Sequence, residues 1–116
     1  MNAFQELGRK VRRFAEERDW AQFHSPKNLS MALAVECAEL MEHFQWLTEN
    51  QSRRLGRRQM REVEKELADI QIYLIRLSQV SGLDLVTAGE KKLLENARKY
   101  PIHKARGSAK KYSKLL

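Results

Sequence analysis

The sequence lacks pairs of cysteines, long apolar runs and a recognisable signal peptide, which are the features of secreted and membrane proteins. It contains one cysteine, Cys37, so no disulfide can form within the chain. No apolar run reaches the roughly 18 residues of a membrane-spanning helix, and the first residues lack the apolar core of a signal peptide. We therefore expect a soluble, cytoplasmic protein that has no membrane partner.

Strand patterns are also missing, and only two prolines and five glycines interrupt the chain. Apolar residues recur instead at steps of three and four, which is the period of an α-helix. We expect an all-α fold in a single domain, residues 1–116. Its four main helices would run from near Phe4 to near Trp20, then over about 29–47, 57–80 and 85–99.

The expected helix ends depend on local signals. Asn28 and Ser30 are candidate N-caps of the second helix, with Pro26 in the preceding loop, and Gly82 is a candidate C-cap of the third. From about residue 101 the chain carries Pro, Gly, Ser and many basic residues, which favours an extended basic tail. A formal net charge of +7 favours anionic partners such as nucleotides or nucleic acid.

Two of the predicted helices carry carboxylates where their apolar stripes should continue. Glu36 lies on the same side as Leu29 and Leu33, and Glu66 on the same side as Val63 and Ile70. A second carboxylate follows each one after three positions, which places both members of each pair on one face of their helix. These second members are Glu39 and Asp69.

Four ionised carboxylates that are buried together repel one another and lose their hydration, so they must either take up protons or surround a cation. Ligands that are all oxygen select hard ions, which predicts Mg²⁺ with Mn²⁺ as a substitute. Two alternatives remain. The carboxylates could be ordinary surface charges, or part of a di-iron site, although the Glu-x-x-His pairs of such sites are missing.

Several segments together resemble one known family. The pattern ExxE, 26 intervening residues and ExxD is similar to that of the all-α nucleoside triphosphate pyrophosphohydrolases called the MazG-like superfamily. The segments "FQW", "ENARKYP" and "RGSAKKY" resemble its dCTP pyrophosphatase branch, and the resemblance runs from about residue 14 to 112.

The resemblance implies an oligomer, with a tetramer preferred over a dimer. It also implies Mg²⁺-dependent hydrolysis of a nucleoside triphosphate, dCTP or a modified dCTP, to monophosphate and pyrophosphate. It assigns the metal to Glu36, Glu39, Glu66 and Asp69, which are also the candidate catalytic residues. It assigns the base and sugar pocket to Trp20 and Trp46. It assigns phosphate or sugar contacts to Tyr73, Lys92 and Asn96.

The residue types agree with this chemistry. Carboxylate-held metal ions neutralise phosphate charge and make a bound water more acidic, and a carboxylate that the metal does not saturate, for which Glu39 is our choice, can accept a proton. Each substrate residue also has a simpler interpretation, since the tryptophans could be core aromatics and Lys92 a solvated lysine. The alternative function is a non-enzymatic helical module that binds nucleic acid through its basic tail and Arg53, Arg54, Arg57 and Arg58. That alternative leaves the inward carboxylates unexplained.

Overall fold

The computed structural model describes residues 1–115 and contains helices and connecting segments, with no strand in that range. It divides into two compact units, Met1–Gly82 and the residues from Leu83 onward, and each is described by itself. Across the described range, no helix combines the length and the apolar character that crossing a membrane requires. The all-α fold class is therefore confirmed.

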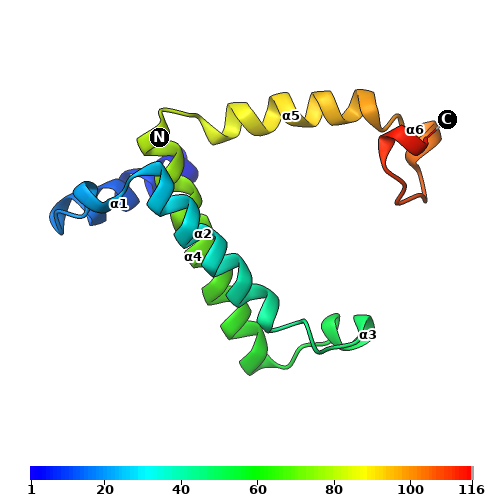
Figure 1. The fold of residues 1–116 in the computed structure, drawn as a ribbon, viewed down its shortest axis with the longest axis horizontal. Helices are drawn as coiled ribbons and strands as arrows, with labels where there is room; N and C mark the ends of the chain where they lie inside the picture. The colour runs from blue at the N-terminus through cyan, green and yellow to red at the C-terminus, as the bar shows by residue number, and fades with distance from the viewer. Residues whose placement is uncertain (116) are drawn as a thin grey trace. The chain divides into compact units, whose positions relative to one another are not determined.

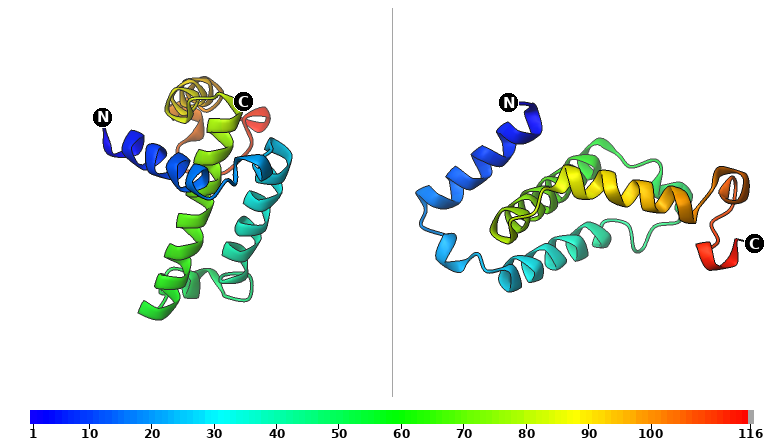
Figure 2. Two further views of the ribbon diagram at one scale, coloured as in Figure 1. Left: turned by 90° about the vertical axis from the view of Figure 1, so that its left-hand side faces the viewer. Right: turned by 90° about the horizontal axis from the view of Figure 1, so that it is seen from above.

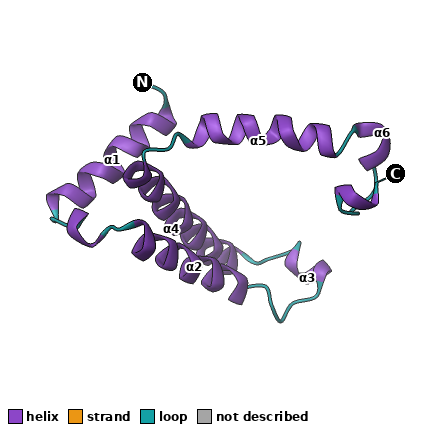
Figure 3. Ribbon diagram, turned by 45° about the horizontal axis from the view of Figure 1, so that its top comes forward, coloured by secondary structure: helices purple, strands orange, loops and turns teal. Residues whose placement is uncertain are grey.

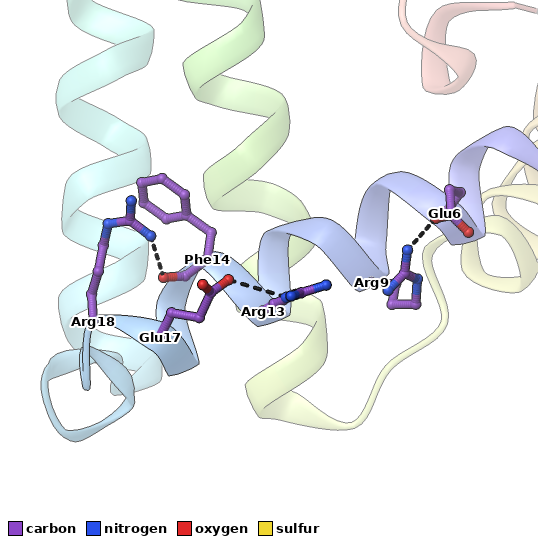
Figure 4. A network of polar contacts seen from close by, with 6 residues as sticks. All are labelled: Glu6, Arg9, Arg13, Phe14, Glu17 and Arg18. Atoms are coloured by element: carbon purple, nitrogen blue, oxygen red, sulfur yellow. Dashed lines mark hydrogen bonds and ion pairs between the residues drawn. The ribbon is translucent and has the colours of Figure 1, made fainter.

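Helix α1 spans Ala3–Glu17 and begins in a capping box, in which Asn2 and Gln5 each bond the other's backbone N–H. On its exposed face, Arg9 forms an ion pair with Glu6, and Arg13 forms one with Glu17 at 3.2 Å (Figure 4). The helix ends three residues before the expected Trp20, which instead precedes a short 3-10 helix, η1, Ala21–Phe23.

Helix α2 spans Pro26–Glu42, so it begins and ends earlier than the sequence suggested. The N-cap is Ser25, whose side chain accepts a hydrogen bond from the Asn28 backbone N–H; the candidate caps Asn28 and Ser30 were wrong. Pro26 is the first helical residue, where its missing N–H costs nothing and its fixed φ suits the helix. After Glu42 the chain continues in single turns as far as Leu47.

A four-residue helix, α3, spans Glu49–Ser52 and has a capping box between Thr48 and Gln51. The longest helix, α4, spans Arg57–Ser81 and ends at Gly82, which has the left-handed φ of +68° expected of a glycine C-cap. The predicted third helix, its bounds and its C-cap are thus confirmed to within one residue.

Within the first unit, α2 and α4 lie side by side and antiparallel, and α1 crosses near the C-terminal end of α4 (Figures 1 and 2). The buried apolar residues come from all three helices: Val11, Ala15, Leu29, Val63 and Ile75. Gln79 on α4 donates a 2.7 Å hydrogen bond to the Gly8 carbonyl on α1, which fixes that crossing. This small core leaves many apolar side chains of α2 and α4 exposed.

The second unit consists of α5, Leu85–Lys99, the short helix α6, Ile102–Ala105, and the 3-10 helix η2, Tyr112–Lys114 (Figure 3). The Asp84 side chain caps α5 by accepting from the Thr87 backbone N–H, and the observed bounds match the sequence prediction. The segment after residue 101 is not extended as expected, since it forms two short helical turns and reverses direction near Gly107, whose φ is +72°.

Candidate metal centre

Three carboxylates from the two antiparallel helices meet at one point. One oxygen from each of Glu36 and Glu39 on α2 and Glu66 on α4 lies within 4.8 Å of the other two. The three-residue spacing places the α2 pair on the face toward α4. The fold therefore brings together three of the side chains that the sequence analysis names as candidate ligands.

These carboxyl groups are unusual because two of their oxygen atoms are buried without a hydrogen-bond partner among the described residues. Oε2 of Glu36 and Oε2 of Glu66 are inaccessible to solvent and have no hydrogen-bond partner among residues 1–115. Burial, and after it the neighbouring carboxyl groups of Glu66, Glu39 and Asp69, together raise the pKa of Glu36 to about 7. No lysine or arginine in the described range forms an ion pair with these three carboxyl groups.

The other polar groups nearby modify this charge only slightly. Nε2 of His43 lies 3.8 Å from Oε1 of Glu66, which is a weak contact that gains strength only if the imidazole is protonated. Asp69 is exposed and lies outside the group of three, although its charge acts on Glu36. The fold thus places three of the four predicted ligands together and the fourth at their edge.

The donor set fits a hard divalent cation. Oxygens bound to one Mg²⁺ lie about 3 to 4.2 Å apart, because each Mg–O distance is about 2.1 Å. The observed separations of up to 4.8 Å are close to this span, so small side-chain rotations would suffice. A cation would also give the two buried Oε2 atoms the partner that each lacks.

The two tryptophans lie at opposite ends of α2. Trp20 precedes this helix and makes edge contacts with Phe14 and His24, at ring-centroid distances of 5.7 and 6.3 Å. Trp46 follows the helix and is 87% exposed. Because the 17 residues of α2 span roughly 25 Å at about 1.5 Å each, the two indoles of one chain do not form a common slot.

The remaining candidate residues lie on other elements. Tyr73 is half-buried on α4, one turn after Asp69. Lys92 and Asn96 lie on α5 in the second unit, where the Lys92 ammonium is 3.3 Å from a Glu95 carboxylate oxygen and Asn96 is half-buried.

A part-buried polar pair in the first unit was missed by the sequence analysis. Arg76 on α4 is 7% exposed, and its Nε donates a 2.9 Å hydrogen bond to Nδ1 of His24. The same guanidinium donates to Gln79 at 3.0 Å. The available signal was a single cation inside the apolar run "IQIYLIRL", a position at which an arginine needs buried acceptors.

Comparisons with known proteins agree with this architecture. The sequence profile of the MazG-like family matches residues 31–115. The chain is 44% identical over 104 residues to dCTP pyrophosphatase 1 of Homo sapiens and 43% identical to that of Mus musculus, in each case over 88% of this chain and 61% of the relative. It therefore spans about three fifths of the length of these relatives.

A solved structure shares the fold. The crystal structure of a pyrophosphatase from Archaeoglobus fulgidus superposes with a TM-score of 0.82 at 37% sequence identity, covering 87% of this chain and 94% of the other. The helical arrangement is thus that of a known pyrophosphatase fold.

Proposed function

Because this chain belongs to the MazG-like family, we propose that it is a nucleotide pyrophosphohydrolase, which hydrolyses a nucleoside triphosphate to the monophosphate and pyrophosphate. One observation carries the proposal: the buried Oε2 atoms of Glu36 and Glu66 lack hydrogen-bond partners among the described residues, beside a third carboxylate. A merely structural cluster of this kind would be destabilising, since buried like charges repel.

Glu36, Glu39 and Glu66 would hold Mg²⁺, or Mn²⁺ in its place, and Asp69 would complete the ligand set by turning inward from the edge of the site. The ion would supply charge neutralisation for the phosphate chain and would make water acidic enough to act as a nucleophile near neutral pH. His43 would then hold Glu66 in orientation through its contact with that carboxylate.

The reaction that these residues suit is attack of water on the α-phosphorus, with pyrophosphate as the leaving group. The attacking water must lose a proton, and we assign its acceptor as Glu39, a carboxylate on the same face as Glu36. Lys92 and Tyr73 are assigned to the phosphates and sugar, together with Asn96, from the family correspondence. A lysine ammonium is a suitable point charge for phosphate.

The proposed substrate is dCTP or a modified dCTP, since the related proteins of Homo sapiens and Mus musculus are named dCTP pyrophosphatase 1. An exposed indole offers a face for stacking on a base, and Trp46 is the more exposed of the two. The separation of Trp20 and Trp46 along α2 means that a base held between two indoles would need one from each of two copies.

A homo-oligomer, with a tetramer favoured over a dimer, suits the exposed apolar surface. Large apolar side chains on both long helices are more than half exposed in the single chain, and contiguous surfaces of this kind normally mark an interface. They are Met31, Val35 and Met41 on α2 and Met60 and Leu67 on α4. A reducing compartment such as the cytoplasm suits the exposed free thiol of Cys37.

A panel of nucleoside triphosphates tests the proposal. The purified chain is incubated with each triphosphate and Mg²⁺, Mn²⁺ or EDTA, and the first products are identified by ion-exchange chromatography. We expect equal amounts of monophosphate and pyrophosphate with either metal, none with EDTA, and the highest kcat/KM for dCTP or a 5-substituted dCTP. Equal turnover of purine and pyrimidine substrates would remove the assigned base preference, and no turnover with any metal would remove the function.

A further inference from the structure

The net positive charge of this protein comes from the last residues of its sequence. Residues 1–95 contain 15 Lys or Arg and 15 Asp or Glu, so they are formally neutral. Residues 96–116 contain seven Lys or Arg and no acidic residue, and they therefore account for the entire formal charge of +7. A charge distribution this uneven indicates an anionic partner for the last segment, whatever the partner of the carboxylate centre is.

The structure folds this segment back on itself, which brings its two ends together. We call residues 100–115 the tail loop. Its chain reverses near Gly107, where the Ser108 N–H donates to the Ala105 carbonyl at 3.0 Å and the Lys110 N–H donates to Ser108 Oγ at 3.2 Å. The return places Tyr112 edge-on against Tyr100 at a centroid distance of 6.3 Å. The loop is therefore closed by a contact between its own two ends.

The closed loop has no acidic group of its own to offset its charge. Lys99 lies 3.2 Å from Glu95 and 5.0 Å from the Tyr112 ring centroid. The six other cations between residues 98 and 114 form no ion pair with any residue in the described range: Arg98, Lys104, Arg106, Lys110, Lys111 and Lys114. Like charges that lie within a Debye length of about 8 to 10 Å repel, so a bound anion would relieve the cost of closing the loop.

We propose that the tail loop binds the phosphate chain of a small anion, such as pyrophosphate or the triphosphate of a nucleotide. Lysine ammonium groups, which make up most of these cations, suit phosphate oxygens as point charges. A polynucleotide is less well matched, because binding of single strands uses open aromatic faces, whereas Tyr100 and Tyr112 contact each other and Tyr112 also contacts Lys99. The choice of a nucleotide as the source of the phosphate rests on the proposed function; the phosphate binding itself does not.

Binding of inorganic pyrophosphate to the full chain in EDTA tests this inference without any catalysis. We would follow the backbone amide signals of Gly107 and Ser108 by NMR and measure affinity by calorimetry at two ionic strengths. We expect these amides to shift, the affinity to fall as salt rises, and the double variant Lys110→Gln/Lys111→Gln to bind about tenfold more weakly, since charge-assisted contacts to phosphate are lost.

The matched control is Arg57→Gln/Arg58→Gln, which removes the same formal charge from the first turn of α4. We expect it to bind pyrophosphate as the unmodified chain does. Equal weakening in both double variants, or no amide shift, would overturn the inference. A single-stranded oligonucleotide that binds the loop more tightly than pyrophosphate at equal phosphate concentration would also overturn it. Loop binding in a chain without hydrolytic activity would support it, and would separate it from failure of the proposed function.

Discussion

Arg76 donates a hydrogen bond from Nε to Nδ1 of His24, at 2.9 Å, and so joins α4 to the segment that leads into α2. The bond requires Nδ1 to be the acceptor, which leaves the proton of the neutral imidazole on Nε2. Burial lowers the pKa of His24, and the positive charge of Arg76 lowers it further. This contact therefore fixes both the position and the protonation state of a histidine that lies beside Trp20.

Removing the arginine should change both properties. We expect Arg76→Ala to destabilise the protein by about 1–3 kcal/mol, because the part-buried acceptors of His24 and Gln79 lose their donor. We also expect it to raise the pKa of His24 toward its ordinary value. Urea denaturation at fixed protein concentration and an NMR titration of the His24 ring measure the two effects. Arg61→Ala, at an exposed arginine of the same helix, is the control. An unchanged His24 titration would contradict this account.

The sign of the pH effect follows from the lowered pKa. The folded protein holds the His24 proton less tightly than the unfolded chain does. The stability that this group contributes is therefore fully present above the unfolded pKa of about 6.5 and is lost as the pH falls below it. The Arg76→Ala protein should lose less of its stability over that range.

Glu36 should produce the opposite slope in the metal-free protein. Its pKa is raised from 4.5 to about 7, so the folded state holds this proton more tightly, and stability falls as the pH rises from 4.5 to 7. We expect Glu36→Gln to flatten this decline in EDTA and to abolish stabilisation by Mg²⁺. Thermal unfolding between pH 4.5 and 8, with and without Mg²⁺, measures both.

Glu42→Gln is the matched control for that experiment, because Glu42 is an exposed carboxylate at the end of the same helix. It should keep the pH slope and the response to Mg²⁺ of the unmodified chain. The same pH slope in Glu36→Gln as in the unmodified chain would remove Glu36 from the coupled site.

Association should cover the exposed apolar surface of α2 and α4. We expect light scattering to give a mass near four times the 13.6 kDa of the chain, or twice it for a dimer. Met31→Glu should shift the population toward smaller species, since Met31 is 57% exposed on α2 and a charge there would have to be buried on association. A mass of 13.6 kDa for the unmodified chain at micromolar concentration would argue against the oligomer.

Trp46 should act through substrate binding. We expect Trp46→Ala to raise KM for dCTP by roughly 5- to 150-fold with little change in kcat, because loss of one stacked aromatic costs about 1–3 kcal/mol. Phe4→Ala, at a partly exposed aromatic of α1, is the control for general effects on folding. Steady-state kinetics that are identical in Trp46→Ala and the unmodified enzyme would rule out the assignment.

Local signals predicted much of the fold. The end of α4 follows from Gly82, the expected C-cap, and the bounds of α5 match those expected from the sequence. The start of α2 differs from the sequence prediction because a proline favours a loop but also suits the first helical position, which Pro26 occupies. The tail loop differs from the extended tail that its composition predicts, because composition does not reveal the contact between Tyr100 and Tyr112.

In the candidate site, too, features that lie within one helix were predictable from the sequence, whereas contacts between distant segments were not. Glu36 and Glu66 were identifiable because each interrupts an apolar stripe of its own helix, which is a local observation. The bond between His24 and Arg76 joins residues 52 positions apart, and no helical period points from one to the other. The separation of Trp20 and Trp46 likewise depends on where α2 begins and ends, which motifs alone do not give.

Hydrolysis of dCTP in ¹⁸O-labelled water is the most direct test of the central claim that water attacks the α-phosphorus at the carboxylate centre. The reaction is run with Mg²⁺ or with EDTA, and the products are analysed by mass spectrometry. Attack at the α-phosphorus predicts the label in dCMP, unlabelled pyrophosphate, and no product in EDTA. Label in the pyrophosphate, or dCDP and orthophosphate as the first products, would contradict it.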